Sequence, residues 1–188
     1  MKLYLVRHGF AFHNLGAEKY GDKAYYMELF EDAELTKKGV EQVSSLTQIL
    51  NKVNFVDIYS SPLQRCIQTC DNCINTNLHI LLDDRLMEPQ GEHICNKRKQ
   101  IPCLKKLLLD MSNKYTLYNI KENYTFDKET SFDVLKRVSD FIDHLKSKYK
   151  ENDKILIITH HDWLNHFMKF IAKENYSFKN GELKIVSI

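Results

Sequence analysis

Arginine and histidine residues at the ends of apolar runs are the features of this sequence most suited to chemistry. Arg7 and His8 follow the run Leu-Tyr-Leu-Val, and His160 follows the run Ile-Leu-Ile-Ile-Thr. An arginine offers a planar cationic fork to an anion, and a neighbouring imidazole can act as a nucleophile. Arg65 adds a second cation near a predicted helix start. Each motif alone also fits a residue that packs or is solvated, but their repetition favours phosphoryl transfer to His8.

Short aliphatic runs are predicted to position these residues. Residues 2–7, 56–59 and 154–159 have the composition of strands that are covered on both faces. Weaker strands are predicted at residues 78–82 and 182–188, the last at a sheet edge because its residues alternate in polarity. The sequence therefore predicts a sheet of five or six strands.

Between these strands, apolar residues recur every three or four positions, which predicts amphipathic helices. One helix is expected over residues 40–50 after Thr36 as its N-cap, and a longer one over residues 132–149. Ser61 is expected to cap a third helix whose first turn contains Arg65. The alternation predicts a three-layer α/β/α sandwich with a mostly parallel sheet, whose ligands bind outside the carboxyl ends of the strands.

Residues 92–128 do not fit this alternation. They contain the basic run at residues 97–99, an apolar stretch at 104–111, and a polar tail with several aromatic residues. We expect them to form a small lid-like excursion over the strand ends, within a single domain that spans residues 1–188. The basic run is expected to be solvated, as charge runs usually are.

Overall charge gives no reason to expect a polyanionic partner. The chain has 27 lysines and arginines against 25 aspartates and glutamates, so its net charge of +2 provides no global field that favours nucleic acid or an anionic membrane. The N-terminal apolar run of four residues is too short for a signal peptide or a membrane span. We therefore expect a cytoplasmic protein that binds a small phosphorylated substrate, with neither nucleic acid nor membrane as a partner.

Cysteine placement argues against a disulfide framework. There are five cysteines, an odd number, and Cys66, Cys70 and Cys73 have helical spacing. Cys70, Cys73, His93 and Cys95 form an alternative zinc set, but a Cys-x-x-Cys within a helix presents its thiols less freely than one in a loop. We predict neither a metal nor another cofactor.

The order of these motifs resembles that of the histidine phosphatase superfamily, also called the phosphoglycerate-mutase-like family, over nearly the whole chain. The matching residues are Arg7-His8-Gly9, Asn14, Leu35-Thr36-x-x-Gly39, Ser61-Pro62-Leu63-x-Arg65, Leu86-x-Glu88, Glu129-Thr130 with Arg137, and Thr159-His160. The stretch from Glu88 to Arg98 is similar to a eukaryotic-type phosphatase-like subgroup, which implies that His93 and Arg98 lie around the pocket mouth. The chain departs from the family pattern at Phe10 and at His161-Asp162.

The resemblance implies a role for each site residue. Arg7, Arg65 and His160 would surround the phosphoryl group while neutral His8 attacks it. The general acid would be Glu88. Asn14 would add a hydrogen bond to the phosphate. At His161 the chain departs from the family, and we expect this residue to line the pocket wall at a position where a backbone N–H can bind phosphate. We expect Glu129 to be structural, because a carboxylate is favourable near the N-terminus of its helix.

Three functions remain open at this point. We favour a phosphomonoester hydrolase that forms a phosphohistidine intermediate. The alternatives are a cofactor-dependent phosphoglycerate mutase and a catalytically silent module that binds a phospho-ligand or a protein. The retention of Arg7, His8, Arg65, Glu88 and His160 disfavours the silent module, and the family's mutases are typically longer than this chain.

Overall fold

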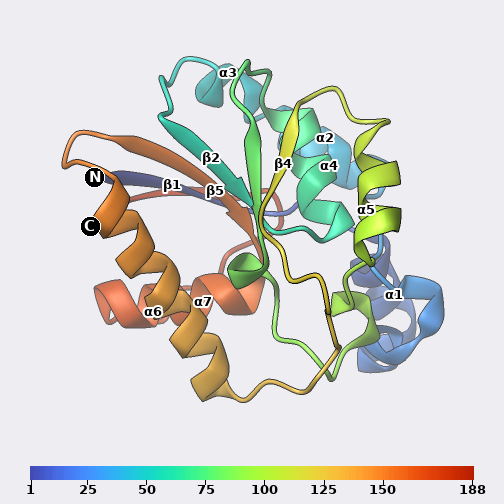
Figure 1. Ribbon diagram of the computed structural model, residues 1–188. Helices are drawn as coiled ribbons and strands as arrows, with labels where there is room; N and C mark the ends of the chain where they lie inside the picture. Colours follow the sequence, from blue (N-terminus) through green and yellow to red (C-terminus); the bar gives the residue numbers. More distant parts are fainter.

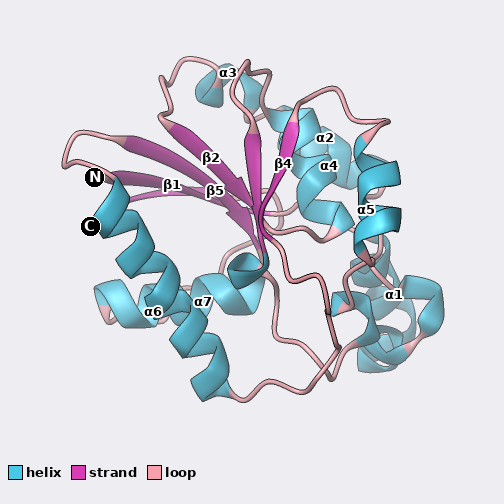
Figure 2. Cartoon of the chain, viewed as in Figure 1, coloured by secondary structure: helices cyan, strands magenta, loops and turns pink.

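Aliphatic residues build a central six-stranded sheet in the computed structural model, which describes residues 1–188 (Figures 1 and 2). The strands lie in the order β4-β3-β2-β5-β1-β6. Their bounds are β1 Lys2–Arg7, β2 Asp57–Ser60, β3 Ile80–Asp83, β4 Tyr115–Asn119, β5 Lys154–Thr159 and β6 Leu183–Ser187. All neighbouring strands are parallel except β6, which pairs antiparallel with β1 at one edge. The predicted mostly parallel sheet and its C-terminal edge strand are confirmed.

Seven helices and four short 3-10 turns connect the strands. The helices are α1 Phe12–Tyr20, α2 Lys37–Ser44, α3 Thr47–Leu50, α4 Gln64–Cys73, α5 Ile101–Leu108, α6 Ser131–Lys148 and α7 His161–Ala172. The turns are η1 Gly21–Tyr26, η2 Glu28–Phe30, η3 Asp84–Leu86 and η4 Ile94–Asn96. None of the helices is both long enough and apolar enough to cross a membrane.

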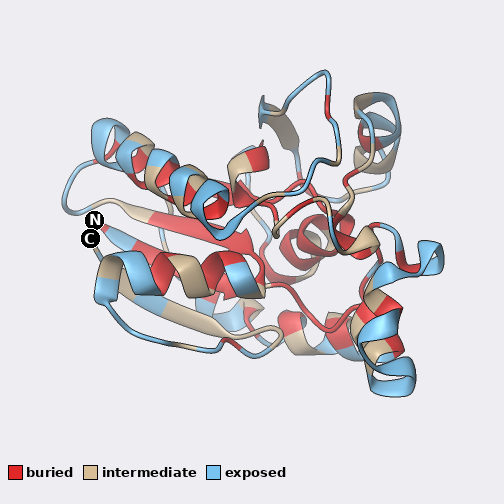
Figure 3. Ribbon diagram, turned by 90° about the horizontal axis from the view of Figure 1, so that it is seen from below, coloured by how far each residue is buried: buried red, intermediate tan, exposed pale blue.

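The helices cover both faces of the sheet, because successive strand residues point to opposite sides. On β1, Leu3 and Leu5 pack in the core cluster that includes residues of α6 and α7. Tyr4 and Val6 pack in a second cluster with residues of α2 and α4. The buried sheet between exposed outer helix faces is visible in Figure 3. The three-layer α/β/α prediction is therefore confirmed.

The structure corrects two predictions about helices: the length of the helix over residues 40–50 and the start of the helix expected at Ser61. The helix expected over residues 40–50 divides into α2 and α3, where the hydroxyls of Ser44 and Ser45 donate to the carbonyl groups of Val40 and Gln42. Such side-chain bonds compete with the regular helix ladder. The predicted N-cap Thr36 is confirmed, because its hydroxyl accepts the N–H of Gly39 at 3.1 Å.

The helix expected to start at Ser61 instead begins at Gln64, after an extended Leu63. The Ser61 hydroxyl accepts a hydrogen bond from the His160 ring at 2.8 Å. The carboxylate of Asp32 accepts the N–H of Gln64 at 2.7 Å and so caps the helix from a distant segment. The first turn of α4 nevertheless contains Arg65, as predicted.

The segment 92–128 is only partly an excursion. It contains α5, whose Leu104 packs against Ile67 and Leu82, and β4, which pairs with β3. Both elements thus belong to the layered fold, and only the stretches on either side of them run outside it (Figure 1). Polar, half-exposed edge strands such as β4 lack the apolar run that identifies a buried strand.

Candidate active site

The carboxyl ends of β1, β5 and β2 meet at one edge of the sheet, where a polar cavity of about 230 Å³ opens. Its lining residues are Arg7, His8, His13, Asn14, Tyr25, Arg65, Glu88, His93, Cys95, Asn96, His161 and Asp162. Six of the seven site residues expected from the sequence are among them. The exception is His160, which is fully buried beside the cavity.

His8 is held as a neutral imidazole with one free nitrogen. Its Nδ1 lies 2.8 Å from the carbonyl oxygen of Gly9. A carbonyl only accepts, so Nδ1 carries the proton and Nε2 keeps its lone pair. Burial, with the nearby charges of Arg65 and Arg7, lowers the pKa of His8 well below its ordinary value. The unprotonated form, which is the nucleophilic one, is thereby favoured.

Gly9 itself is required by close packing. A Cβ atom at this position would lie 2.6 Å from the carbonyl oxygen of Gly39 and 2.9 Å from a methyl group of Val43. The backbone after β1 therefore runs directly against α2. This contact fixes the point at which His8 leaves the sheet.

Arg7 presents unused donors to the cavity. Its Nη1 donates to the carbonyl oxygen of Phe178 at 2.7 Å, while its buried Nε has no hydrogen-bond partner. A buried N–H without a partner is costly. A guanidinium in this state suits an anion that accepts the remaining hydrogen bonds.

Arg65 is almost completely buried and is held on three sides. Its Nε donates to His160 Nδ1 at 3.3 Å, its Nη1 to the carbonyl oxygen of Cys95 at 2.8 Å, and its Nη2 to Asn96 Oδ1 at 3.0 Å. Three of its five N–H groups are therefore used, and two remain. The 3-10 turn η4 supplies Cys95 and Asn96, so this turn orients the second cation of the site.

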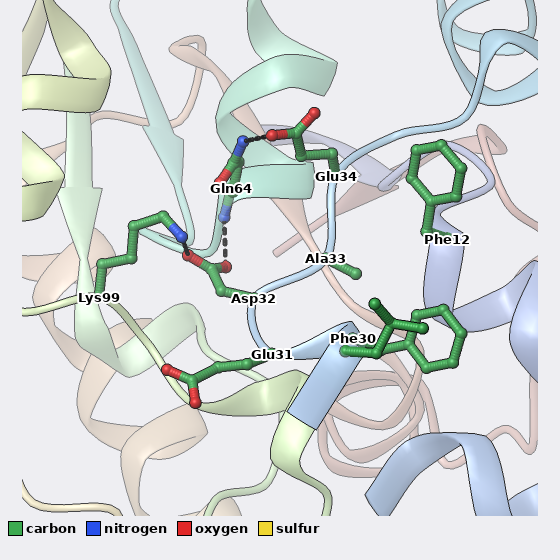
Figure 4. A pocket seen from close by; sticks show the side chains of 9 residues that line it. Phe12, Phe30, Glu31, Asp32, Ala33, Glu34, Gln64 and Lys99 are labelled. Atoms are coloured by element: carbon green, nitrogen blue, oxygen red, sulfur yellow. Dashed lines mark hydrogen bonds and ion pairs between the residues drawn. The ribbon is translucent and has the colours of Figure 1, made fainter. Parts of the chain in front are cut away.

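A neighbouring hollow of about 380 Å³ shows how α4 is anchored (Figure 4). Asp32, which is buried, accepts the Gln64 N–H and lies 3.6 Å from Lys99 Nζ. The Gln64 side chain donates to Glu34 at 2.7 Å. Burial raises the pKa of Asp32 to about 6. These contacts fix the start of α4 and hence the position of the next residue, Arg65.

His160 differs from the sequence-based expectation, because it does not line the cavity. Its Nδ1 accepts from Arg65 Nε, so the proton resides on Nε2, which donates to Ser61 Oγ at 2.8 Å. Its ring centroid is 5.2 Å from that of His8. Burial lowers the pKa of His160 well below its ordinary value. Because both ring nitrogens of His160 are engaged, this residue helps to position Arg65 and leaves no nitrogen free for a ligand.

Glu88 lies at the N-terminus of α7. One carboxylate oxygen accepts the N–H of Asp162 at 3.1 Å, and the other accepts from Asp162 and Trp163, each at 3.1 Å. Burial and the negative charge of Asp162 raise the pKa of Glu88 to about 7, although the backbone donors oppose the shift. A carboxyl group with this pKa can hold or release a proton near neutral pH.

Asn14 and His161 complete the predicted set. The Oδ1 of Asn14 accepts the N–H of Ala11 at 3.0 Å, which leaves the amide N–H groups of Asn14 as donors. His161 Nδ1 lies 3.2 Å from the carbonyl oxygen of Phe178, and its Nε2 is 4.0 Å from Asp162 Oδ1. Both side chains form part of the cavity wall.

Comparison with known proteins identifies the family. The family sequence model of the histidine phosphatase superfamily (branch 1) matches residues 3–185 of the chain. The chain belongs to the histidine phosphatase superfamily. A curated relative, "Probable phosphoglycerate mutase" of Arthroderma benhamiae, is 28% identical over 162 residues, which cover 73% of this chain and 46% of the relative. The chain thus spans about half the length of this relative.

Solved structures of the superfamily have the same fold. The α-ribazole phosphatase of Shigella flexneri superimposes with a TM-score of 0.69 at 19% identity, covering 100% of this chain and 91% of that one. A phosphoserine phosphatase of Entamoeba histolytica, solved with 3-phosphoglyceric acid, gives 0.64 at 22% identity and covers 98% and 89%. At these identities the likeness establishes the fold alone.

Several lining residues of this superfamily member had no assigned role from sequence. His13 is buried with its ring centroid 5.7 Å from that of His8, and the Tyr25 ring lies 5.1 Å from that of His93, tilted by 34°. Tyr25 lies in a polar connection, where no local pattern singles it out. Asn96 lies within the stretch from Glu88 to Arg98 that resembles the phosphatase-like subgroup, and its contact with Arg65 crosses 31 residues of sequence.

The structure corrects the expectation for Arg98 and shows where the residues of the alternative zinc set lie. Arg98 does not lie at the cavity mouth or in solvent: it is buried and pairs with Asp84 at 3.0 Å. The alternative zinc set is dispersed, because Cys70 and Cys73 pack in the core whereas His93 lines the cavity. No group of three or more potential ligands comes together in the structure.

Proposed function

We propose that this protein is a phosphomonoester hydrolase that transfers a phosphoryl group from a small substrate to His8 and then to water. The observation that carries this proposal is the arrangement of His8 between two arginines in one cavity, with Nε2 of His8 unprotonated and a buried donor of Arg7 unpaired. Such preorganised donors stabilise the charge of a phosphoryl group in transfer.

In the first step, His8 Nε2 attacks phosphorus and the bond from phosphorus to the leaving oxygen breaks. The free N–H groups of Arg7 and Arg65 donate to the equatorial oxygens, and the amide of Asn14 donates a further hydrogen bond. Protonated Glu88 gives its proton to the leaving oxygen, so an alcohol departs rather than an alkoxide. The products are phospho-His8, the alcohol and ionised Glu88.

In the second step, ionised Glu88 takes a proton from water while the water oxygen attacks phosphorus. The bond from phosphorus to Nε2 breaks, and inorganic phosphate leaves with His8 neutral and Glu88 protonated again. A single carboxyl group thus serves as acid and then as base. His160 acts as a positioning residue, since it holds Arg65 and packs against His8.

The dimensions and charge of the cavity favour a small phosphorylated substrate. Its volume of about 230 Å³ admits a phosphate with a compact leaving group, and most of its lining residues are polar or charged. The named activities of the two solved neighbours, α-ribazole phosphatase and phosphoserine phosphatase, concern small phosphate esters as well. Release of inorganic phosphate should therefore be screened across sugar phosphates, nucleotides, phosphorylated metabolites and phosphopeptides.

The name of the curated relative makes phosphoglycerate mutase the second candidate. A mutase must keep water from its phosphoenzyme until the intermediate reorients, which requires a closed site. The deciding experiment measures phosphate release and isomerisation of 2- and 3-phosphoglycerate, with and without 2,3-bisphosphoglycerate as primer. We expect hydrolysis to be faster. Primer-dependent isomerisation that exceeds hydrolysis would establish the mutase instead, and failure of every substrate would leave the silent binding module.

The scheme draws its positive charge from Arg7 and Arg65, which occupy the role that metal ions play in other phosphoryl-transfer enzymes. Dialysis against a chelator is therefore expected to leave turnover unchanged. Loss of turnover on dialysis, with recovery on addition of zinc or magnesium, would contradict this part of the proposal.

A further inference from the structure

Arg137 of α6 and Glu129, which precedes this helix, form a two-pronged ion pair outside the cavity. Arg137 Nε lies 2.7 Å from Glu129 Oε1, and Arg137 Nη2 lies 2.8 Å from Glu129 Oε2. The side chains are 13% and 20% exposed. Bidentate pairs of this kind fix both partners in orientation as well as in distance.

The same arginine also holds the backbone just before Glu88. Its Nη1 donates to the carbonyl oxygen of Arg85 at 2.9 Å and to that of Met87 at 2.6 Å. All three of its nitrogens are thus engaged. The planar guanidinium spans a carboxylate on one side and two carbonyl groups on the other, which the single ammonium of a lysine cannot reproduce.

Glu129 holds the backbone just after Glu88. Its Oε2 accepts the N–H of Gln90 at 2.9 Å, and its own N–H donates to the carbonyl oxygen of Gln90 at 3.1 Å. The chain between Leu86 and Ile94 has no helix or strand to hold it. The ion pair therefore supplies one fixed point on each side of Glu88, and Asn96 adds another by donating to the carbonyl oxygen of Pro89 at 2.9 Å.

We propose that the Glu129–Arg137 ion pair is a positioning device that sets the carboxyl group of Glu88 against the leaving oxygen of the substrate. The inference rests on the proposed function, in which Glu88 is the general acid. Neither member of the pair lines the cavity; both line a separate hollow behind the 85–90 segment. Because the pair binds the backbone around Glu88 and does not line the cavity, its main effect on the reaction should pass through Glu88.

A misplaced general acid has a distinctive kinetic signature. An alkyl leaving group departs as a strongly basic alkoxide unless it is protonated, whereas p-nitrophenolate is a stable anion that needs little protonation. General acid catalysis typically contributes about 10²-fold or more. We expect Arg137→Met to reduce kcat/KM for glycerol 3-phosphate by about 10²-fold, and kcat/KM for p-nitrophenyl phosphate by less than about 5-fold. The ratio kcat/KM is used because it reports the first phosphoryl transfer.

Three further variants make the comparison decisive. Glu88→Gln removes the acid itself and should show the same selectivity between the two substrates. Arg137→Lys keeps the charge but not the fork, so it should show an intermediate selective loss and provides a second variant if Arg137→Met does not fold. Lys148→Met removes the cation of a more exposed ion pair on α6, with Asp57, and should leave the substrate ratio unchanged.

A uniform loss on both substrates in Arg137→Met and Arg137→Lys, alongside a selective loss in Glu88→Gln, would overturn the inference and leave the proposed function intact. If Glu88→Gln shows no selectivity, then Glu88 is not the acid and the positioning role fails with it. A change of the substrate ratio in Lys148→Met of the same size as in Arg137→Met would also overturn the inference, because any weakening of α6 would then suffice.

Discussion

Two polar clusters lie on opposite sides of the 85–90 segment, and they differ in how their charges are paired. In the cavity, Arg7 has a buried N–H without a partner and His8 has a free lone pair. In the rear cluster, formed by Asp84, Arg98, Glu129 and Arg137, each charge meets an opposite one at 2.7 to 3.0 Å. The cavity keeps its groups available for a ligand, whereas the rear cluster uses its groups to hold backbone.

The pKa values of the two reacting groups in the cavity, His8 and Glu88, are both shifted from their ordinary values. The pKa of His8 is lowered by burial and by arginines, and that of Glu88 is raised by burial and by Asp162. Such opposed shifts place a neutral nucleophile beside a protonated acid, which is the combination that phosphoryl transfer needs.

The largest expected effect on stability is at the rear cluster. Arg98→Met removes one member of a buried ion pair and leaves the Asp84 carboxylate with the N–H of Lys121 but no cation in contact, which should lower the free energy of unfolding by about 3–5 kcal/mol. The adjacent Lys97 pairs with Glu31 at the surface, so Lys97→Met should cost only about 0–1 kcal/mol. Urea unfolding of both variants tests the contrast. Similar small changes would mean that Arg98 is not held as described.

The largest expected effect on turnover is in the cavity. Arg65→Ala removes preorganised donors from the transferred phosphoryl group, and kcat/KM should fall by about 10²-fold or more. Its free energy of unfolding should change less than that of Arg98→Met, since Arg65 stands near another cation, Arg7. Steady-state phosphate release and urea unfolding provide the two measurements. Near-normal turnover of Arg65→Ala would remove it from the phosphate site.

A smaller effect is expected on the pH dependence of kcat/KM when Asp162 is replaced. Glu88 must be protonated to donate, so activity should fall as the pH rises past about 7, while the limb due to protonation of His8 should lie at acidic pH, below its ordinary pKa. Asp162 raises the pKa of Glu88 through its negative charge. Asp162→Asn should therefore move the alkaline limb to lower pH. A shift to higher pH, or none, would contradict the electrostatic coupling.

The sequence predicts well what local patterns determine. The aliphatic runs of β1 and β5 and the strand-end positions of Arg7, His8 and His160 follow from periodicity, and the structure agrees. Tertiary pairing escapes such patterns. Arg98 lies in a basic run that reads as solvated, yet its partner Asp84 is fourteen residues earlier in the chain.

Asp32 and β4 show the same limitation. Asp32 caps α4 from 32 residues away, so Ser61 appeared to be the local cap. The strand β4 is polar because it lies half-exposed at the sheet edge. Contacts between distant segments, rather than local propensity, decided both features and also the direction in which His160 points.

The most direct test of the account is to trap the phosphoenzyme. Rapid acid-free quenching of the protein during turnover of a labelled phosphate ester, followed by peptide mapping, should reveal label on His8 that is stable to base and labile to acid. The label should be absent in His8→Ala and still form in Glu88→Gln when p-nitrophenyl phosphate is the donor. Undiminished labelling of His8→Ala would contradict the central claim that His8 receives the phosphoryl group.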